Sequence, residues 1–295
     1  MKKNKNIMIS KNIIRKSLDD AIIKCGYTLH DLFTDFNPKD FKQERYSRKD
    51  GQICSADISP VGPLQQRQED LQSKINYTNE EKSMLMDYSV DFWTYSAYFY
   101  HKGMFGDEWK LNCYKMDEKE WEKNSRRVLK EPNELVDFNI YDFDAMEEYR
   151  LKKGHDDYTP FPEYRIKKIP FEKGIKAFDN MIDKSPPLQE NTVLYRVGYF
   201  DSNLKPGETG KWKSYTSTTF NSYQAKHGLK KHLGVAGKSS RYQIKIYAPK
   251  GTKGVVPCLN TGTRDWQSEF TLGRNQKYMV INVDHLNQTA EVLLY

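Results

Sequence analysis

Two polar side chains that could do chemistry stand close together near the C-terminal end of the chain. In the stretch RDWQSEFTLGRNQKY, Gln267 and Glu269 are two positions apart within a segment that alternates like a β-strand. A strand here presents Gln267, Glu269 and Thr271 on one face and buries the apolar residues between them. An amide and a carboxylate presented together could bind a polar substrate, but a polar face is also ordinary on a half-buried strand.

Two further strand-like segments carry polar residues that could belong to the same site. In LYRVGY, Arg196 lies among apolar and aromatic residues, where a guanidinium needs a partner because unpaired burial is costly. The partner could be an acidic side chain at a strand edge or a bound anion. In YTSTTF, Ser217, Thr218 and Thr219 follow one another, and their hydroxyls could orient a carboxylate or amide, although threonine is also common in strands.

The elements that would position these residues follow a helix-then-strand order. NYTNEEK contains a capping box, with Thr78 as the N-cap and Glu81 three residues later. A second amphipathic helix has Ile175, Phe178 and Ile182 on one face and ends at KSPP, because proline cannot continue it. Seven β-branched or aromatic segments follow, separated by Gly, Pro and Asn. Helices first and strands afterwards predict an α+β fold.

The chain divides by composition into an N-terminal arm and one domain. Its 295 residues are 37% hydrophobic and 13% aromatic, which is enough for a globular core. We expect residues 1–74 to form a partly helical or disordered arm or linker, and residues 75–295 to form the domain. Within the domain, residues 103–165 read as a charged insertion rich in tyrosine, which we expect on the surface.

The sequence shows no membrane span, no standard secretory start and no metal-ligand spacing. No stretch approaches the roughly 18 to 20 apolar residues that a spanning helix needs. The four cysteines are far apart and without CxxC spacing, so we expect reduced thiols and no zinc site. These features predict a cytoplasmic protein, or one delivered into a target cell without a signal peptide by a phage particle, a specialised secretion system or a mobile element. Association with a virion is a further option.

The net charge of +7 is concentrated in the C-terminal third. Residues 201–295 contain 11 Lys and 3 Arg against 3 Asp and 3 Glu, a net charge of +8. Such a surface could attract nucleic acid, an acidic protein or a polyphosphate ligand, or could be an ordinary solvated face.

Taken in order, the polar motifs resemble the Arg-Ser-Glu class of mono-ADP-ribosyltransferases, the bacterial exotoxin type. That class has an arginine on a strand, then an aromatic-x-Ser-Thr-Ser/Thr run, then Gln/Glu-x-Glu, and this chain has YRVG, YTSTT and QSE in that order. The resemblance extends through YTNEEKSMLMDYS, KAFDNMIDKSPPLQENTVLYRV, IYAPKGTKGVV and QSEFTLGRNQKYMVI. It covers residues 75–295, matches 103–165 poorly and leaves 1–74 outside. The Gln-x-Glu form is similar to the clostridial Rho-modifying exoenzymes.

The resemblance implies two packed, antiparallel-rich β-sheets that form an NAD cleft, flanked by N-terminal helices. It implies that Glu269 stabilises the positive charge that develops on the ribose when the nicotinamide bond breaks. Ser217 is then expected to hold Glu269, and Arg196 to pair with the NAD phosphates. Thr218 and Thr219 are expected to support this strand beside the cofactor.

Further roles follow from the same resemblance. Gln267 is expected to contact the acceptor, and Tyr195, Gly198 and Tyr223 to lie near the cofactor. Val197 separates Arg196 from Gly198, whereas the class often has glycine directly after the arginine. NAD is the expected substrate, and no metal is expected, because electrostatic stabilisation and positioning account for the chemistry.

The acceptor is predicted to be a macromolecule, and a protein side chain such as asparagine is the first choice. Glutamine two residues before the glutamate occurs in asparagine modifiers and in the guanine-modifying, pierisin-like branch, whereas glutamate there is typical of arginine modifiers. Modification of nucleic acid is therefore one alternative. A catalytically degenerate NAD-fold module of a virus particle is another, and NAD glycohydrolase side activity is a further option.

Overall fold

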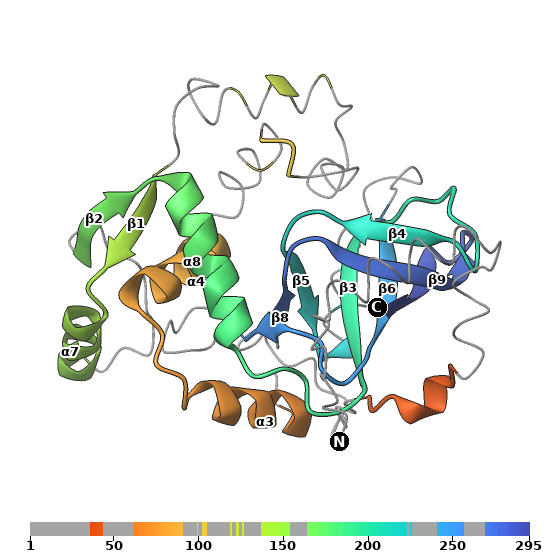
Figure 1. Ribbon diagram of the computed structural model, residues 1–295, viewed down its shortest axis with the longest axis horizontal. Helices are drawn as coiled ribbons and strands as arrows, with labels where there is room; N and C mark the ends of the chain where they lie inside the picture. Colours follow the sequence, from red (N-terminus) through yellow and green to blue (C-terminus); the bar gives the residue numbers. More distant parts are fainter. Residues whose placement is uncertain are drawn as a thin grey trace, which may run out of the picture.

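The computed structural model describes residues 36–43, 62–90, 99, 102–104, 119, 122–123, 126, 137–153, 164–222, 225, 241–256 and 269–295 (Figure 1). The helices are η1 (Pro38–Asp40), α3 (Pro63–Gln72), α4 (Asn79–Val90), α7 (Phe143–Lys153) and α8 (Phe171–Lys184). The strands are β1 (Phe138–Tyr141), β2 (Arg165–Ile169), β3 (Thr192–Tyr199), β4 (Thr209–Trp212), β5 (Thr216–Thr219), β6 (Arg241–Ala248), β7 (Gly254–Val255), β8 (Glu269–Leu272), β9 (Gln276–Asp284) and β10 (Thr289–Leu294). The predicted α+β class is confirmed, since the helices named above all precede the strands of the large sheet in sequence.

The large sheet consists of two halves that fold over a shared core. Its strand order is β4-β9-β10-β6-β3-β5-β8-β7, and β10 with β6 is the one parallel pair among these strands. The halves are joined at a single residue pair, Tyr195 on β3 and Thr219 on β5. One core cluster contains Ile244 from the first half and Phe270 and Leu272 from the second, so the halves pack face to face. The predicted packed, antiparallel-rich sheets are therefore present as halves of one sheet.

Helices α4 and α8 cover the free face of the β5-β8-β7 half (Figure 1). Another core cluster joins Leu85 and Tyr88 of α4 and Phe178 of α8 to Tyr215 and Val255 at the sheet. The remaining apolar residues predicted for one face of α8 are Ile175 and Ile182, and both are buried. Helix α8 buries its apolar stripe against the sheet here. This packing sets the position of β5 and β8 relative to the helix.

The predicted capping box forms at the start of α4. The Thr78 amide donates to Oε2 of Glu81 at 2.8 Å, and the Glu81 amide donates to Oγ1 of Thr78 at 3.2 Å. Glu81 also forms an ion pair with Lys184 at the end of α8, with 2.6 Å between Oε1 and Nζ. The two helices are thereby tied together beside the sheet.

Residues 36–43 cover the β3-β6 region on the face that points away from the core between the two halves. The Phe36 and Phe41 rings meet Tyr247 of β6 edge-on, with centroids 5.0 and 5.2 Å apart. Lys42 forms a parallel bridge with Thr192, and its amide donates to the Asn191 carbonyl at 2.9 Å. Part of the region predicted as an arm thus contacts the sheet, and the boundary near residue 74 stays a prediction.

Helix α3 docks through glutamines rather than through an apolar stripe. The Val256 amide at the end of β7 donates to Gln72 Oε1 at 3.0 Å, and Gln72 Nε2 donates to the Gly254 carbonyl at 3.5 Å. Gln68 Nε2 donates to the Pro186 carbonyl at 2.6 Å. The Gln72 amide therefore pairs with the backbone of the outermost strand of the sheet as a neighbouring strand would.

The expectation that residues 103–165 lie on the surface is wrong for β1. Phe138 and Ile140 are buried, because β1 packs against α4. The Asn139 amide donates to Asp87 Oδ2 at 2.9 Å, which fixes the strand to the helix. Gly174 of α8 allows this approach, since a Cβ there would lie 2.1 Å from the Phe138 ring. The partner strand β2 is exposed along nearly its whole length.

Candidate active site

Glu269 opens strand β8, and its side chain is partly exposed, whereas the next three residues are buried. The Thr271 hydroxyl donates to Glu269 Oε1 at 2.9 Å. Both residues lie on one face because side chains two positions apart on a strand share a face. The carboxylate therefore has one oxygen bound by a buried neighbour of its own strand.

The strand register surrounds this carboxylate with hydroxyl groups. Thr219 of β5 lies directly opposite Glu269, and Ser217 lies directly opposite Thr271. Residues opposite one another in an antiparallel pair project to the same face with Cβ atoms about 4.5–5.5 Å apart. The structure thus brings Ser217, Thr219, Glu269 and Thr271 together, and the predicted hold of Ser217 on Glu269 stays a prediction.

Tyr88 reaches this face from helix α4. Its hydroxyl lies 3.4 Å from Ser217 Oγ and 3.4 Å from the Tyr215 carbonyl oxygen. The Tyr88 ring is buried against the rings of Phe178 and Tyr215. Helix α4 therefore contacts β5, the strand that carries Ser217, directly.

A second network fixes the start of β5 to the turn after β8. The Tyr215 hydroxyl donates to Asp179 Oδ1 at 2.8 Å, and Arg274 donates from Nε to the same oxygen at 3.0 Å and from Nη2 to Oδ2. Burial and then the Asp179 charge raise the pKa of Tyr215, so this phenol stays a donor. The hydrogen bonds to Asp179 raise the pKa of Arg274 further.

Arg196 lies on a different side of the sheet from Glu269. Tyr195, not Arg196, stands in the cross-strand row with Thr219 and Glu269, so strand alternation turns Arg196 toward the core between the two halves. Its guanidinium carbon is 5.6 Å from the centroid of the Trp212 ring, and the residue is 8% exposed. Its predicted contact with NAD phosphates stays a prediction.

The other predicted cofactor residues hold the strands in place. The Thr218 hydroxyl donates to the Phe270 carbonyl on β8, and the Thr219 hydroxyl accepts from the Asn221 amide at 3.0 Å. Gly198 is buried and pairs with Tyr242 of β6. Tyr195 is 5% exposed within the core cluster that Phe41 covers.

Several predicted residues lie outside the part of the chain that the structure describes. They are Gln267, Tyr223, Cys25, Cys54, Cys113 and Cys258. Within the described ranges, no group of three or more His, Cys, Asp or Glu side chains could hold a metal ion.

The sequence reading missed the partners that fix the site. Tyr88 carries the spacing of an apolar helix face, which gives no sign that its hydroxyl meets Ser217. Asp179 and Arg274 are 95 positions apart and give no local signal. Thr271 was not missed, because strand parity alone places it on the same face as Glu269.

The arrangement suits stabilisation of positive charge beside a polar substrate. A partly exposed carboxylate that is held by a hydrogen bond can face a substrate hydroxyl or a developing cation. The adjacent hydroxyls supply donors and acceptors at fixed spacing. The described site therefore has a carboxylate that can stabilise positive charge and hydroxyl groups that can position a substrate.

No protein-family model matches the chain, and no curated protein matches it in sequence. Among solved structures, the ADP-ribosyltransferase Vis, a toxin of Vibrio splendidus determined in complex with agmatine, is 13% identical with a TM-score of 0.41 over 78% of this chain and 83% of that one. C3stau2 from S. aureus, determined with NAD, is 14% identical with a TM-score of 0.39 over 79% and 94%. The C3 exoenzyme of Clostridium limosum is 13% identical with a TM-score of 0.36 over 78% and 92%. These are similarities at low identity, and the function proposed below rests on the residues of this chain.

Proposed function

We propose that the protein is a mono-ADP-ribosyltransferase that uses NAD as its substrate and modifies a macromolecule. The observation that carries the proposal is the partly exposed Glu269 carboxylate, held at 2.9 Å by Thr271 on a face that also presents Ser217 and Thr219. The order of Arg196, Ser217 and Glu269 along the chain supports it through the resemblance described above.

The proposed reaction requires stabilisation of positive charge and needs no nucleophile from the protein. The bond between the ribose carbon and nicotinamide breaks, and nicotinamide leaves with the electron pair. The ribose then carries positive charge, which the Glu269 carboxylate stabilises more in the transition state than in bound NAD. The acceptor atom forms the new bond to the same carbon and loses its proton.

Arg196 has two proposed roles that a conservative variant separates. It pairs with NAD phosphates in one, and in the other it braces β3 against Trp212, where its guanidinium lies. Arg196→Lys keeps a cation but loses the planar fork and the stacking surface. Weaker NAD binding at unchanged stability supports the phosphate role, and lower stability at unchanged NAD affinity supports the bracing role.

We propose a protein side chain, with asparagine first, as the acceptor. Gln267 is the proposed acceptor contact, and an amide there cannot act as a base toward a guanidinium. Agmatine, a small guanidinium compound, therefore tests the acceptor class directly. Wild-type protein should leave agmatine unmodified, and Gln267→Glu should gain modification of agmatine if this position selects the acceptor.

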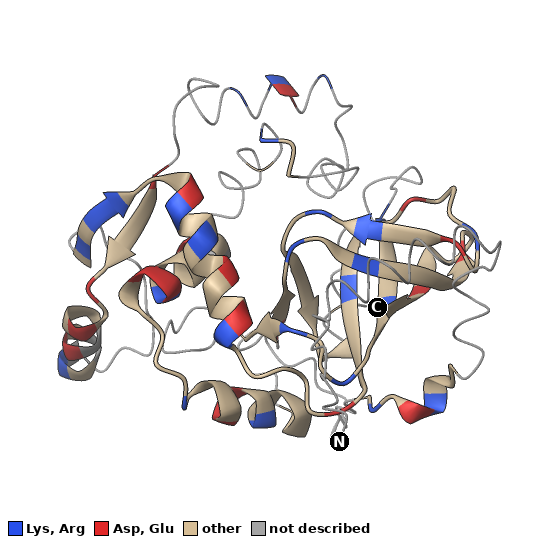
Figure 2. Ribbon diagram, in the orientation of Figure 1, with Lys and Arg blue, Asp and Glu red and all other residues tan. Residues whose placement is uncertain are grey.

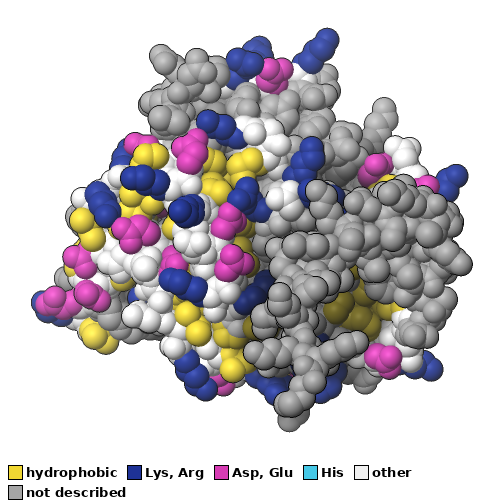
Figure 3. Space-filling view, in the orientation of Figure 1, with side chains coloured by type: hydrophobic (Ala, Val, Ile, Leu, Met, Phe, Trp, Pro, Cys, Tyr) yellow, Lys and Arg dark blue, Asp and Glu magenta, His cyan; other side chains and the backbone are white. Residues whose placement is uncertain are grey.

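Some of the basic residues in the described C-terminal third make contacts within the protein. Arg274 is bound by Asp179, and Lys253 Nζ donates to the Asp183 and Ser185 carbonyls at 2.7 and 2.8 Å. Figure 2 shows basic segments on β4 and β9, and Figure 3 shows basic, acidic and apolar side chains intermingled over the helices of the visible face. Part of the net charge of +8 thus serves internal contacts.

Among the described residues, no helix is both long and apolar enough to cross a membrane. We propose that the protein acts inside a target cell. Transport by a phage particle, a specialised secretion system or a mobile element is the proposed delivery route.

The decisive experiment incubates the full chain and a cell lysate with NAD labelled in the adenylate part. Glu269→Gln is the test variant, because it keeps the shape and removes the charge. Glu208→Gln is the matched control, since Glu208 lies in the exposed turn before β4 and accepts the Lys205 amide at 2.8 Å. Products are treated separately with protease and with nuclease.

Label that is removed by protease, survives in Glu208→Gln and disappears in Glu269→Gln supports the proposal. Label removed by nuclease moves the acceptor to nucleic acid. Nicotinamide release without labelled macromolecule indicates NAD glycohydrolase activity. Absence of both label and nicotinamide release, with no rise in melting temperature on adding NAD, supports a binding or structural module instead.

A further inference from the structure

We propose that Thr271 is a positioning residue that orients the Glu269 carboxylate through its hydroxyl. The inference rests on the function proposed above and assigns a second residue to the same site. Its basis is the hydrogen bond from Thr271 Oγ1 to Glu269 Oε1 at 2.9 Å. Both residues lie on β8, so the bond forms within one strand and does not depend on how the helices pack.

The donor is held rigidly by its surroundings. Thr271 is 0% exposed, whereas Glu269 is partly exposed. Its backbone stands in register between Ser217 on β5 and Val255 on β7, the two strands that flank β8. A β-branched side chain in that position has few rotamers open to it, so the position of the hydroxyl oxygen is restricted.

The presence of threonine at position 271 is explained better by its hydroxyl than by packing. Valine has nearly the shape of threonine, favours strands as well and has no hydroxyl to desolvate. A buried hydroxyl is neutral or unfavourable unless it is hydrogen-bonded. Here its acceptor is the carboxylate that the proposed chemistry requires, which links the burial of this polar group to the orientation of Glu269.

The consequence is that one carboxylate oxygen has a fixed position. Oε1 accepts the Thr271 hydroxyl and is fixed toward the buried end of β8, as the 2.9 Å contact shows. Loss of the Thr271 donor removes this restraint on the carboxylate, which lowers the fraction of Glu269 in the reactive orientation and leaves most NAD contacts unchanged.

The test compares Thr271→Val and Thr271→Ser with wild type in steady-state nicotinamide release and thermal unfolding. We expect Thr271→Val to lower kcat about 10-fold, with KM for NAD changed less than about twofold. Thr271→Ser should recover at least half of the lost rate, because it keeps the hydroxyl. Thr216→Val is the control, since this fully buried threonine on β5 donates to the Ser214 carbonyl at 3.4 Å on the opposite face.

Crystal structures of wild type and Thr271→Val supply a readout that does not need activity. The Glu269 carboxylate should keep its contact with Thr271 in the wild type and turn away in the variant. The same orientation in both, or wild-type kcat in Thr271→Val, overturns the inference. A wild type that releases no nicotinamide refutes the proposed function, and the comparison of carboxylate orientation still decides the positioning role.

Discussion

Asp179 of helix α8 and Arg274 of the turn after β8 form a two-bond ion pair, with Arg274 Nε 3.0 Å from Asp179 Oδ1 and Nη2 on Oδ2. The Tyr215 hydroxyl shares Oδ1 at 2.8 Å. One carboxylate therefore connects a helix to both strands that carry the candidate site. The bond geometry is that of a planar guanidinium on a carboxylate, which holds direction as well as distance.

Asp179→Asn should destabilise the protein and reduce activity together. The amide cannot accept both Arg274 bonds and the Tyr215 bond, so partly buried donors lose partners at a cost of about 1–3 kcal/mol. Urea unfolding and nicotinamide release measure the two effects. Glu172→Gln on the same helix is the control, because its pair with Lys102 at 3.4 Å is exposed and should be worth less than about 1 kcal/mol. Equal effects of the two substitutions would contradict the role of Asp179.

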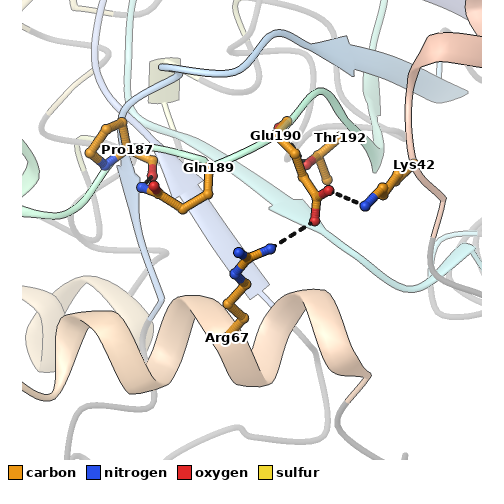
Figure 4. A network of polar contacts seen from close by, with 6 residues as sticks. All are labelled: Lys42, Arg67, Pro187, Gln189, Glu190 and Thr192. Carbon is orange, nitrogen blue, oxygen red and sulfur yellow. Dashed lines mark hydrogen bonds and ion pairs between the residues drawn. The ribbon is translucent and has the colours of Figure 1, made fainter.

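Glu190→Gln should loosen residues 36–43 from the sheet. Glu190 pairs with Lys42 and, at 3.3 Å, with Arg67 of α3, so it joins two N-terminal elements to the start of β3 (Figure 4). Since Lys42 and Arg67 are exposed, each pair is worth about 0–1 kcal/mol. Hydrogen exchange at the Lys42 and Val193 amides, which bond across this junction, should quicken about two- to fivefold.

The matched control for that exchange experiment is Glu148→Gln. Its pair with Lys152 lies within α7 and both side chains are exposed. Exchange at Lys42 and Val193 should stay at the wild-type rate in this variant. Unchanged exchange in Glu190→Gln as well would show that the Glu190 ion pairs do not hold the segment.

Thr78→Ala should destabilise α4 by about 1 kcal/mol, because it removes the side-chain acceptor for the Glu81 amide. Thr78→Ser should retain most of the stability, since serine supplies the same oxygen. Thermal unfolding at constant protein concentration measures both. A shift in melting temperature that is the same for the two variants would indicate that the methyl group, not the cap, matters.

Tyr195→Phe should change how steeply the free energy of unfolding falls at alkaline pH. Burial, and then the Glu291 charge, raise the pKa of Tyr195 in the folded protein. The pKa of tyrosine in the unfolded chain is about 10. The stability that the neutral Tyr195 phenol contributes to the folded protein is therefore complete below pH 10 and is lost as the pH rises above that value. Between pH 10 and pH 11 the wild type should lose about 1 kcal/mol more unfolding free energy than the variant. Urea unfolding of both proteins at pH 10 and pH 11 measures this difference, and equal losses would contradict the role of Tyr195.

The sequence alone determined the helix-then-strand order, the capping box and the strands with strong alternation. Thr78 with Glu81 follows from local spacing, and the segments at β3, β6 and β9 follow from β-branched and aromatic content. Strand parity likewise placed Glu269 and Thr271 on one face. These features depend on neighbours within a few residues, which is the range that a sequence pattern reports.

The tertiary structure decided what the local pattern could not carry. Strand β4, TGKW, has no apolar alternation and forms because β9 pairs with it, while β1 is buried because α4 covers it. Register set Tyr195 rather than Arg196 in line with Glu269, since a shift of one residue exchanges the two faces of a strand. Pairing between distant strands and helices therefore determined which of the predicted residues meet, and added Tyr88, Asp179 and Arg274 to them.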